Sequence, residues 1–173
     1  AFLLLISFLA ATPILCNVPT SDVVVIESIA EYTATYNGIP IKARRTVSFV
    51  KNNIYEDILD ASSLFGTLSQ LSRYKFDHSG KLLPLYSYDK RSFFGAIRHE
   101  EQKFLWNENK VVYKKKGEIT EVFIPANAYD TSTHRLQLQR DLVEGQVVFE
   151  YVVINRGKKQ LYKYQKVGEE TIE

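Results

Sequence analysis

Hydrophobic and polar residues alternate along most of this chain, and short turn signals separate the alternating segments. In residues 30–36, AEYTATY, Tyr32 and Tyr36 share one side, because successive side chains of a strand point to opposite faces. The Asn37-Gly38 dipeptide that follows is the strongest short signal of a β-hairpin. A sequence of this kind predicts strands that pair antiparallel with their neighbours along the chain.

The same arrangement recurs to the end of the chain. Residues 39–50 and 54–63 read as strands, and further alternating segments flank turn signals at residues 77–80, 107–110 and 156–157. Residues 64–72 fit either a strand or a short helix. Pro84 lies inside one alternating segment, and because proline lacks the backbone donor of a ladder, that strand is expected to lie at an edge or to carry a bulge.

One segment, YDTSTHRLQLQRDLVEG, breaks the pattern. Asp130 or Thr131 can cap the free amides of a helix, and Gly145 can end it. A strand is the alternative, because LQLQ also alternates. An open sheet of many strands leaves unpaired edges. We therefore expect a mainly β chain: a single antiparallel meander of about nine strands, forming a strongly curved sheet or a partly closed barrel with one short helix.

The first 16 residues, AFLLLISFLAATPILC, contain no charged residue. This is the shape of a secretory signal, whereas a membrane-spanning helix needs about 20 apolar residues. We expect cleavage after Cys16; lipidation of Cys16 and an uncleaved membrane anchor are the alternatives. The absence of a basic start and of methionine indicates a signal peptide trimmed at its start. A mature chain without cysteine fits an exported protein.

The expected organisation is a signal peptide at residues 1–16, an extended leader at 17–29 and one β-rich domain at 30–173. Removing 16 of the 173 residues leaves a length that fits one domain with its own hydrophobic core. The formal net charge of +2 is too small to indicate a nucleic-acid partner.

The sequence lacks the motifs of common enzyme classes. It contains no P-loop, no G-x-S-x-G and no G-x-G-x-x-G. His78, His99 and His134 are isolated, and a structural zinc site needs four nitrogen or sulfur ligands. Adjacent carboxylates such as Glu100-Glu101 would point to opposite faces of a strand, which does not suit an acid–base pair. We expect no catalytic residue, no cofactor and no metal.

Arg45 lies on the apolar face of its strand. A buried guanidinium is costly unless it is paired. One hypothesis is that Arg45 meets the acidic head of an amphiphile inside a curled sheet. The alternatives are a bulge that turns Arg44 and Arg45 outward, or an ion pair with Asp57 or Asp60 on the next strand.

Six tyrosines occur in three pairs, two of them two residues apart and the first four residues apart, so that each pair shares one face of its strand. Core packing explains them by default. If the sheet encloses a cavity, the same rings form an amphipathic lining with an apolar body and a polar tip. The candidate ligand-lining residues are therefore Tyr32, Tyr36, Arg45, Tyr86, Tyr88, Tyr162 and Tyr164.

Four segments, in this order, resemble the exported bacterial family known as domain of unknown function 3108. They are EYTATYNGIPIKA, LSRYKFDHSGKLLPLYSYDKR, AYDTSTHRLQLQRDL and YKYQKVGEETIE, and the resemblance covers nearly all of residues 30–173. Lys42 stands where the family often has glycine. The resemblance implies the periplasm of a Gram-negative bacterium and a further strand after the V-G-E-E segment. The family has no established activity, cofactor or catalytic residue.

The sequence thus predicts a non-catalytic periplasmic protein that binds or carries an apolar or amphiphilic, lipid-like ligand in a curved β-sheet. The alternative is an envelope protein–protein interaction module without a small-molecule ligand. As partners we expect a lipid or another amphiphile, or an envelope protein, with peripheral contact with a membrane left open, and no nucleic acid.

Overall fold

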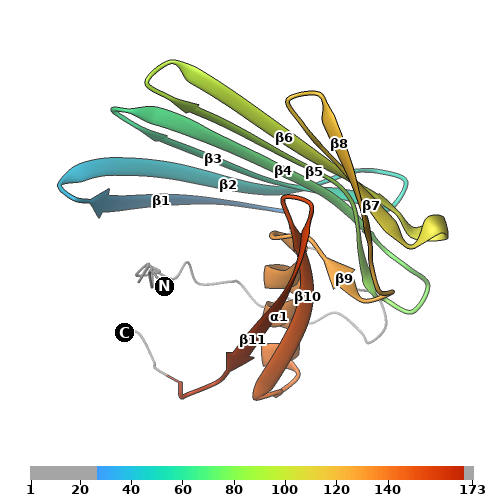
Figure 1. The fold of residues 1–173 in the computed structure, drawn as a ribbon. Helices are drawn as coiled ribbons and strands as arrows, with labels where there is room; N and C mark the ends of the chain where they lie inside the picture. Colours follow the sequence, from blue (N-terminus) through green and yellow to red (C-terminus); the bar gives the residue numbers. More distant parts are fainter. Residues whose placement is uncertain (1–26, 170–173) are drawn as a thin grey trace.

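A computed structural model describes residues 27–169. Eight consecutive strands pair antiparallel, each with the next along the chain, in the order β1-β2-β3-β4-β5-β6-β7-β8. Figure 1 shows them as one broad sheet. The strands are β1 (Ser28–Tyr36), β2 (Ile39–Lys51), β3 (Ile54–Ser63), β4 (Gly66–Phe76), β5 (Leu82–Phe93), β6 (Ala96–Leu105), β7 (Lys110–Lys115) and β8 (Glu118–Phe123).

A smaller second layer lies against one face of this sheet (Figure 1). It contains α1 (Thr133–Val143) and a three-stranded sheet in the order β11-β10-β9. Its strands are β9 (Ala128–Tyr129), which runs parallel to its neighbour, and the hairpin of β10 (Val148–Asn155) and β11 (Lys158–Gln165). A short 3₁₀ helix, η1 (Trp106–Glu108), joins β6 to β7.

The prediction of a mainly β chain with an antiparallel meander and one short helix is confirmed. The strands are divided between two sheets, however, instead of forming one meander of about nine. In the part that the structure describes, β1 and β8 are the two edges of the large sheet and are not paired with each other. The large sheet is therefore open. The helix and the β10–β11 hairpin cover part of the face that closure would have buried.

Several local predictions can be compared with the structure. Residues 64–72 contribute to a strand, β4, and the segment at residues 130–144 forms the helix α1. Pro84 lies in the central strand β5, at a bulge where the pairing with β4 shifts register. Of the two predictions for this strand, the bulge is confirmed and the position at a sheet edge is wrong. Ile119 on β8 is exposed, whereas Val122 packs against the hydrophobic core. The signal peptide and nearly all of the leader lie outside the described residues.

The strand register brings side chains of the partly covered face, here called the inner face, into rows that cross the sheet. The first row contains Ala34, Ile41, Ser63, Gly66, Phe93 and Ala96, and the second contains Tyr32, Ala43, Ala61, Leu68, Arg91 and Arg98. The third contains Ala30, Arg45, Leu59, Gln70, Asp89, Glu100 and Lys115, and the fourth contains Ser28, Val47, Asp57, Ser72, Ser87, Gln102 and Tyr113.

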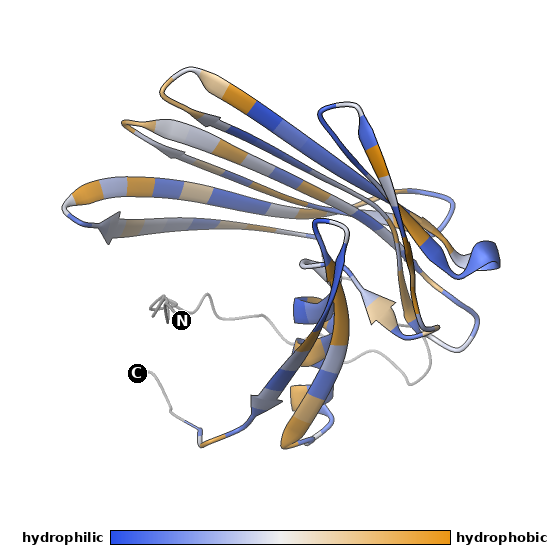
Figure 2. Cartoon of the chain, in the orientation of Figure 1, coloured by the Kyte–Doolittle hydropathy of each residue, from blue (hydrophilic) through white to orange (hydrophobic). Residues whose placement is uncertain are grey.

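The hydrophobic core lies at the end of the sheet beyond the fourth row. Figure 2 shows how hydrophobic and hydrophilic residues alternate along the strands and that β10 is largely hydrophobic. One cluster contains Tyr74, Phe76, Leu82, Tyr129, Phe149, Tyr151 and Val153. The other contains Phe104, Val111, Ile124, Ala128 and Ile154. Both join the large sheet to the second layer, so burial of apolar area holds the two layers together at this end.

The turn between β10 and β11 attaches the second layer to the middle of the inner face. The backbone N–H of Gly157 donates to the Gln102 side-chain oxygen at 2.8 Å, and the Gln102 amide donates to the carbonyl of Ile154 at 3.3 Å. Gly157 has a φ of +66°, and a Cβ at this position would lie 2.6 Å from the ring of Tyr113. Only glycine fits both the turn and the contact.

Replacing Gly157 by alanine therefore tests this attachment. The strained φ alone costs about 1–2 kcal/mol, and the overlap with Tyr113 adds roughly 1–3 kcal/mol. The matched control is Gly38→Ala, because Gly38 also has a positive φ of +77° but has no atom within 4 Å of the added methyl group. Urea unfolding should show the larger loss for Gly157→Ala; equal losses would contradict the contact.

Candidate functional site

A polar cavity of about 300 Å³ lies between the inner face and the second layer. Its walls are the third and fourth rows of the sheet, the start of α1 and the β10–β11 turn. We call it the interlayer cavity. Its charged lining residues are Asp89, Arg91, Glu100, Asp130, Arg135 and Arg156. A lining this rich in charge suits a polar or ionic group better than a hydrocarbon chain.

Asp130 joins the sheet to α1 at the buried end of the cavity. Its carboxylate accepts the backbone N–H groups of Ser132 at 3.0 Å and Thr133 at 2.7 Å, which are free amides of the first helical turn. It also accepts the hydroxyl of Ser72, on β4, at 2.5 Å. Burial raises the pKa of Asp130, and these hydrogen bonds oppose that effect. The N-cap residue of α1 is Ser132, so Asp130 accepts the first free amides from two residues before the N-cap, and the same carboxylate connects the two layers.

His134 is buried next to this carboxylate. Its Nδ1 lies 3.2 Å from the Asp130 carbonyl oxygen, and its Nε2 lies 3.1 Å from the Tyr164 hydroxyl. Burial lowers the pKa of His134 to about 4, so the ring is neutral at neutral pH. With both ring nitrogens in contact with protein groups, His134 positions α1 against β11.

Arg45 forms a two-point ion pair with Asp57, one of the alternatives that the sequence left open. Its Nε and Nη2 donate to the two carboxylate oxygens at 2.9 and 2.8 Å. The Asp57 side chain is only 2% exposed and that of Arg45 20%. Asp57 neutralises the guanidinium of Arg45. The ion pair therefore stabilises the pairing of β2 with β3, and Arg45 is not available to bind the head group of a ligand.

The acidic residues on the sheet side of the cavity are paired as well. Asp89 accepts two hydrogen bonds from Arg91, at 2.7 and 2.6 Å, and one from Gln70 at 2.9 Å. Glu100 accepts the Tyr113 hydroxyl at 2.8 Å and forms an ion pair with Lys115 at 3.0 Å. No carboxylate on this wall is left as a free base.

Two arginines near the cavity, Arg135 and Arg98, have no carboxylate partner among the described residues. Arg135 lies at the mouth of the cavity and is exposed to solvent, although surrounding protein atoms are close enough to lower the pKa of its guanidinium. Arg98 lies opposite Arg91 at the end of the second row. Within residues 27–169, neither Arg98 nor Arg135 forms an ion pair. Both guanidinium groups can therefore receive an anion.

The other half of the inner face is apolar. The first row and the β1–β4 part of the second row consist mainly of alanine, leucine, isoleucine and aromatic side chains, and neither core cluster includes them. We call this surface the open half. The second row lies next to the third row, whose residues line the interlayer cavity. The open half thus adjoins the charged cavity.

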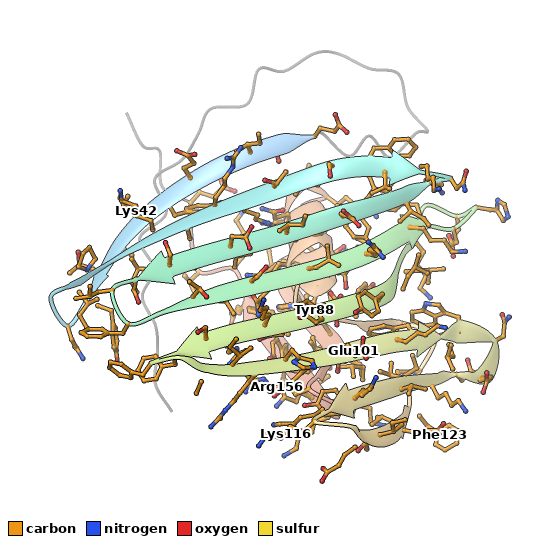
Figure 3. The ribbon with its side chains drawn as sticks, turned by 90° about the horizontal axis from the view of Figure 1, so that it is seen from above. Lys42, Tyr88, Glu101, Lys116, Phe123 and Arg156 are labelled. Carbon is orange, nitrogen blue, oxygen red and sulfur yellow. The ribbon has the colours of Figure 1, made fainter. Side chains whose placement is uncertain are left out.

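The structure separates the tyrosines that the sequence grouped as a lining. Tyr32 lies on the open half, and Tyr36 lies on the same face of β1 beyond the first row. Tyr162 and Tyr164 pack from β11 against the first core cluster, with Tyr162 also bordering the cavity. Tyr86 and Tyr88 do not belong with them. Their side chains lie on the outer face, where Figure 3 shows Tyr88 and Glu101.

Contacts on the outer face account for these two residues. The Tyr86 hydroxyl donates to Glu101 at 3.0 Å, and the Tyr88 ring stacks on His99 at 6.4 Å between centroids, although Tyr88 also borders the cavity along β5. The expectation that they face the same interior as Tyr32 is wrong, because the register of β5 places Ser87 and Asp89 on the inner face instead.

The residues that give the site its charge were not among those predicted from the sequence. Arg91, Arg98 and Arg135 are far apart in the sequence and carry no motif. One signal could have found two of them: Arg91 and Arg98 lie symmetrically on either side of the Phe94-Gly95 turn, so a hairpin at that turn pairs them.

The described residues contain no group of three or more His, Cys, Asp or Glu side chains arranged to hold a metal ion. Over the same residues, no helix has the length and hydrophobicity that a bilayer crossing requires.

Comparison with known protein families, with curated proteins and with solved structures finds no match. The resemblance to domain of unknown function 3108 therefore remains a hypothesis that depends on the four quoted segments.

The ion pair of Arg45 with Asp57 can be measured by a double-mutant cycle. Asp57→Leu leaves a largely buried guanidinium unpaired and should cost about 2–4 kcal/mol of unfolding free energy, whereas the double variant Arg45→Met with Asp57→Leu should lose less than the two single variants Arg45→Met and Asp57→Leu together. The control is the outer-face pair of Arg73 with Glu56, whose Arg73 side chain is 50% exposed; its coupling should stay below about 1 kcal/mol. Equal coupling in both pairs would contradict a structural role for Arg45.

His134 predicts a loss of stability in acid. Its pKa of about 4 in the folded protein lies below the ordinary value of 6.5, so as the pH falls from 6.5 to 4 the unfolded chain binds a proton that the folded chain does not. The loss should reach about 3 kcal/mol at most. His134→Gln removes this titration but leaves that of Asp130, so the difference in unfolding free energy between the two proteins should change over this range. A constant difference would show that His134 is not buried as described.

Proposed function

We propose that this protein is a non-catalytic binding protein that holds an amphiphile with an anionic head group against the inner face of its large sheet. One observation carries the proposal: the second row changes from apolar side chains on β1–β4 to arginines on β5 and β6. A single ligand lying along this row meets hydrocarbon at one end and guanidinium groups at the other.

The open half suits the apolar part of such a ligand. Neighbouring strands lie about 4.8 Å apart, so the four side chains from Tyr32 to Leu68 span roughly 14 Å. The surface is made of the sheet itself, whose backbone donors and acceptors are already paired within the ladder. Covering these side chains gains about 25 cal/mol per Å² of apolar area without burying an unpaired backbone group.

The arginines suit the head group. Arg98 has no ion pair among the described residues, and Arg91, directly opposite, is held in place by Asp89. Arg135 approaches the same region from α1. A guanidinium binds a carboxylate or phosphate through parallel hydrogen bonds, and such charge-assisted bonds are about twice as strong as neutral ones.

The groups that acid–base catalysis would need have structural partners instead. The Asp130 carboxylate accepts bonds from Ser72 and from the first turn of α1, and both nitrogens of His134 contact protein groups. These contacts support a binding role. The uncharged segment at residues 1–16 supports export, and the resemblance to domain of unknown function 3108 is the reason for proposing the periplasm as its destination.

The decisive experiment measures binding of palmitate and of a phosphorylated single-chain lipid by native mass spectrometry and by displacement of a fluorescent fatty acid. Ala61→Glu introduces a charge in the second row and should abolish binding. Ser62→Glu is the matched control, because the next residue of β3 points to the opposite face. Arg98→Glu should weaken binding of both lipids by about tenfold or more, with little effect on an uncharged monoacylglycerol.

Two results would overturn the proposal: no lipid bound by the unaltered protein, or equal binding by Ala61→Glu and Ser62→Glu. A clean unliganded protein that instead forms a stable complex with an envelope protein would favour the interaction module that the sequence left as the alternative.

A further inference from the structure

All four turns within the pairs β1–β2, β3–β4, β5–β6 and β7–β8 lie at the same end of the large sheet, because every strand reverses direction. Figure 1 shows the first three turns side by side at the end furthest from the core. We call residues 33–42, 62–69, 90–98 and 114–120 the tip surface. Large apolar side chains are exposed on it: Leu64 is 83% exposed and Phe94 72%, and Tyr36, Phe93, Ile97 and Ile119 are exposed as well.

The aromatic side chains at the tips form a defined cluster. The rings of Phe65 and Phe94 are 5.3 Å apart and those of Phe93 and Phe94 4.6 Å, and the backbone N–H of Phe94 donates to the carbonyl of Phe65 at 3.1 Å. Phe94 adopts a φ of +47°, a conformation that bulky residues rarely adopt. Neighbouring turns therefore support each other in holding an exposed phenylalanine in a strained position.

The same segments are strongly basic. They contain seven Lys or Arg residues and one acidic residue, Glu118. Lys42, Lys90, Arg98 and Lys116 form no ion pair within the described residues. Figure 3 shows Lys42 and Lys116 towards the turn ends of β2 and β7. The tip surface thus has the composition of a contact surface for something both apolar and negatively charged.

We propose that the tip surface docks the protein onto an anionic lipid bilayer. Leu64 and the Phe93–Phe94 turn enter the interface between headgroups and acyl chains, and the surrounding lysines and arginines contact lipid phosphates. Aromatic residues favour this depth of a bilayer, and each basic residue near an anionic leaflet strengthens binding. Among the described residues, Leu64, Phe93 and Phe94 line neither the interlayer cavity nor a second, open hollow bordered by residues of β1–β5, which favours a fluid surface over a protein partner.

Docking in this way brings the open half of the inner face to the bilayer, because its first row is part of the tip surface. A ligand could then pass between the membrane and the second row without crossing water. The docking proposal does not depend on ligand binding, and the two are tested with different probes.

Flotation with vesicles of phosphatidylglycerol and phosphatidylcholine measures docking. The unaltered protein should float with mixed vesicles and not with pure phosphatidylcholine, and raised salt should weaken its binding. Leu64→Asp with Phe94→Asp should lower vesicle affinity by about tenfold or more. Lys90→Glu with Lys116→Glu should do so by a similar factor, because neither lysine has an ion pair to lose.

The matched control is Phe123→Asp. Phe123 is 75% exposed but lies at the other end of β8, away from the tip surface (Figure 3), so its replacement should leave vesicle affinity unchanged. Circular dichroism checks that each variant keeps the β-sheet signal. Leu64→Asp with Phe94→Asp should also still bind palmitate in solution, which separates docking from the proposed function.

The proposal is overturned if the unaltered protein does not float with anionic vesicles. It is also overturned if the tip variants float as well as Phe123→Asp, or if the tip residues are instead required for a stable complex with a protein partner in the absence of lipid. Ala61→Glu that loses palmitate but still floats would leave docking intact.

Discussion

The second layer of this protein is shorter than the sheet that it packs against. β2 has 13 residues, or about 43 Å, whereas β10 has 8 residues, or about 26 Å, and α1 has 11, or about 16 Å. A layer of this length covers only part of the inner face. Everything else follows from that difference: a core at one end, an open apolar half at the other, and a polar boundary between them.

Buried polar groups explain how the boundary is stable. A charge that leaves water must find a partner, and Asp57, Asp89, Glu100 and Asp130 all have one. Among the described residues, the Tyr74 hydroxyl is the buried side-chain polar atom without a hydrogen-bond partner. Asp130 joins the two layers through Ser72. Asp57, Asp89 and Glu100 accept hydrogen bonds from residues of the large sheet itself. Arg98 and Arg135 remain, which gives the boundary a cationic side towards the open half.

The two proposals share one electrostatic basis. Basic side chains without ion pairs lie beside apolar ones on the second row and again at the hairpin tips, and both surfaces are at the end of the sheet that the second layer leaves uncovered. Burial of apolar area favours the association of a ligand or a bilayer with such a surface, but the hydrophobic effect has no preferred direction or charge. The arginines and lysines add the preference for an anion. The core end of the sheet has its apolar side chains buried and its acids paired.

Local chemistry made much of the fold predictable. Asn37-Gly38 and Arg156-Gly157 specify tight hairpins, and Asp130 accepts free amides at the start of α1, because these signals act through the backbone of a few neighbouring residues. Alternation correctly separated Tyr32 from Thr33, and it placed Arg45 on the inner face. It could not group the tyrosine pairs, because Tyr86 and Tyr32 belong to strands whose relative register depends on every bulge and turn between them, including the bulge at Pro84.

The sequence by itself therefore determined where the strands turn, which side chains share a face within each strand, and where the helix begins. Only the tertiary structure decided that the meander stays open, that Asp57 and not a ligand neutralises Arg45, and that Arg91 and Arg135 line one cavity. The reason is the number of residues that separate the contacting groups along the chain. Hairpins and caps are made by residues a few positions apart, whereas the covering of one sheet by a second layer joins residues such as Ser72 and Asp130, 58 positions apart, and no local pattern encodes that contact.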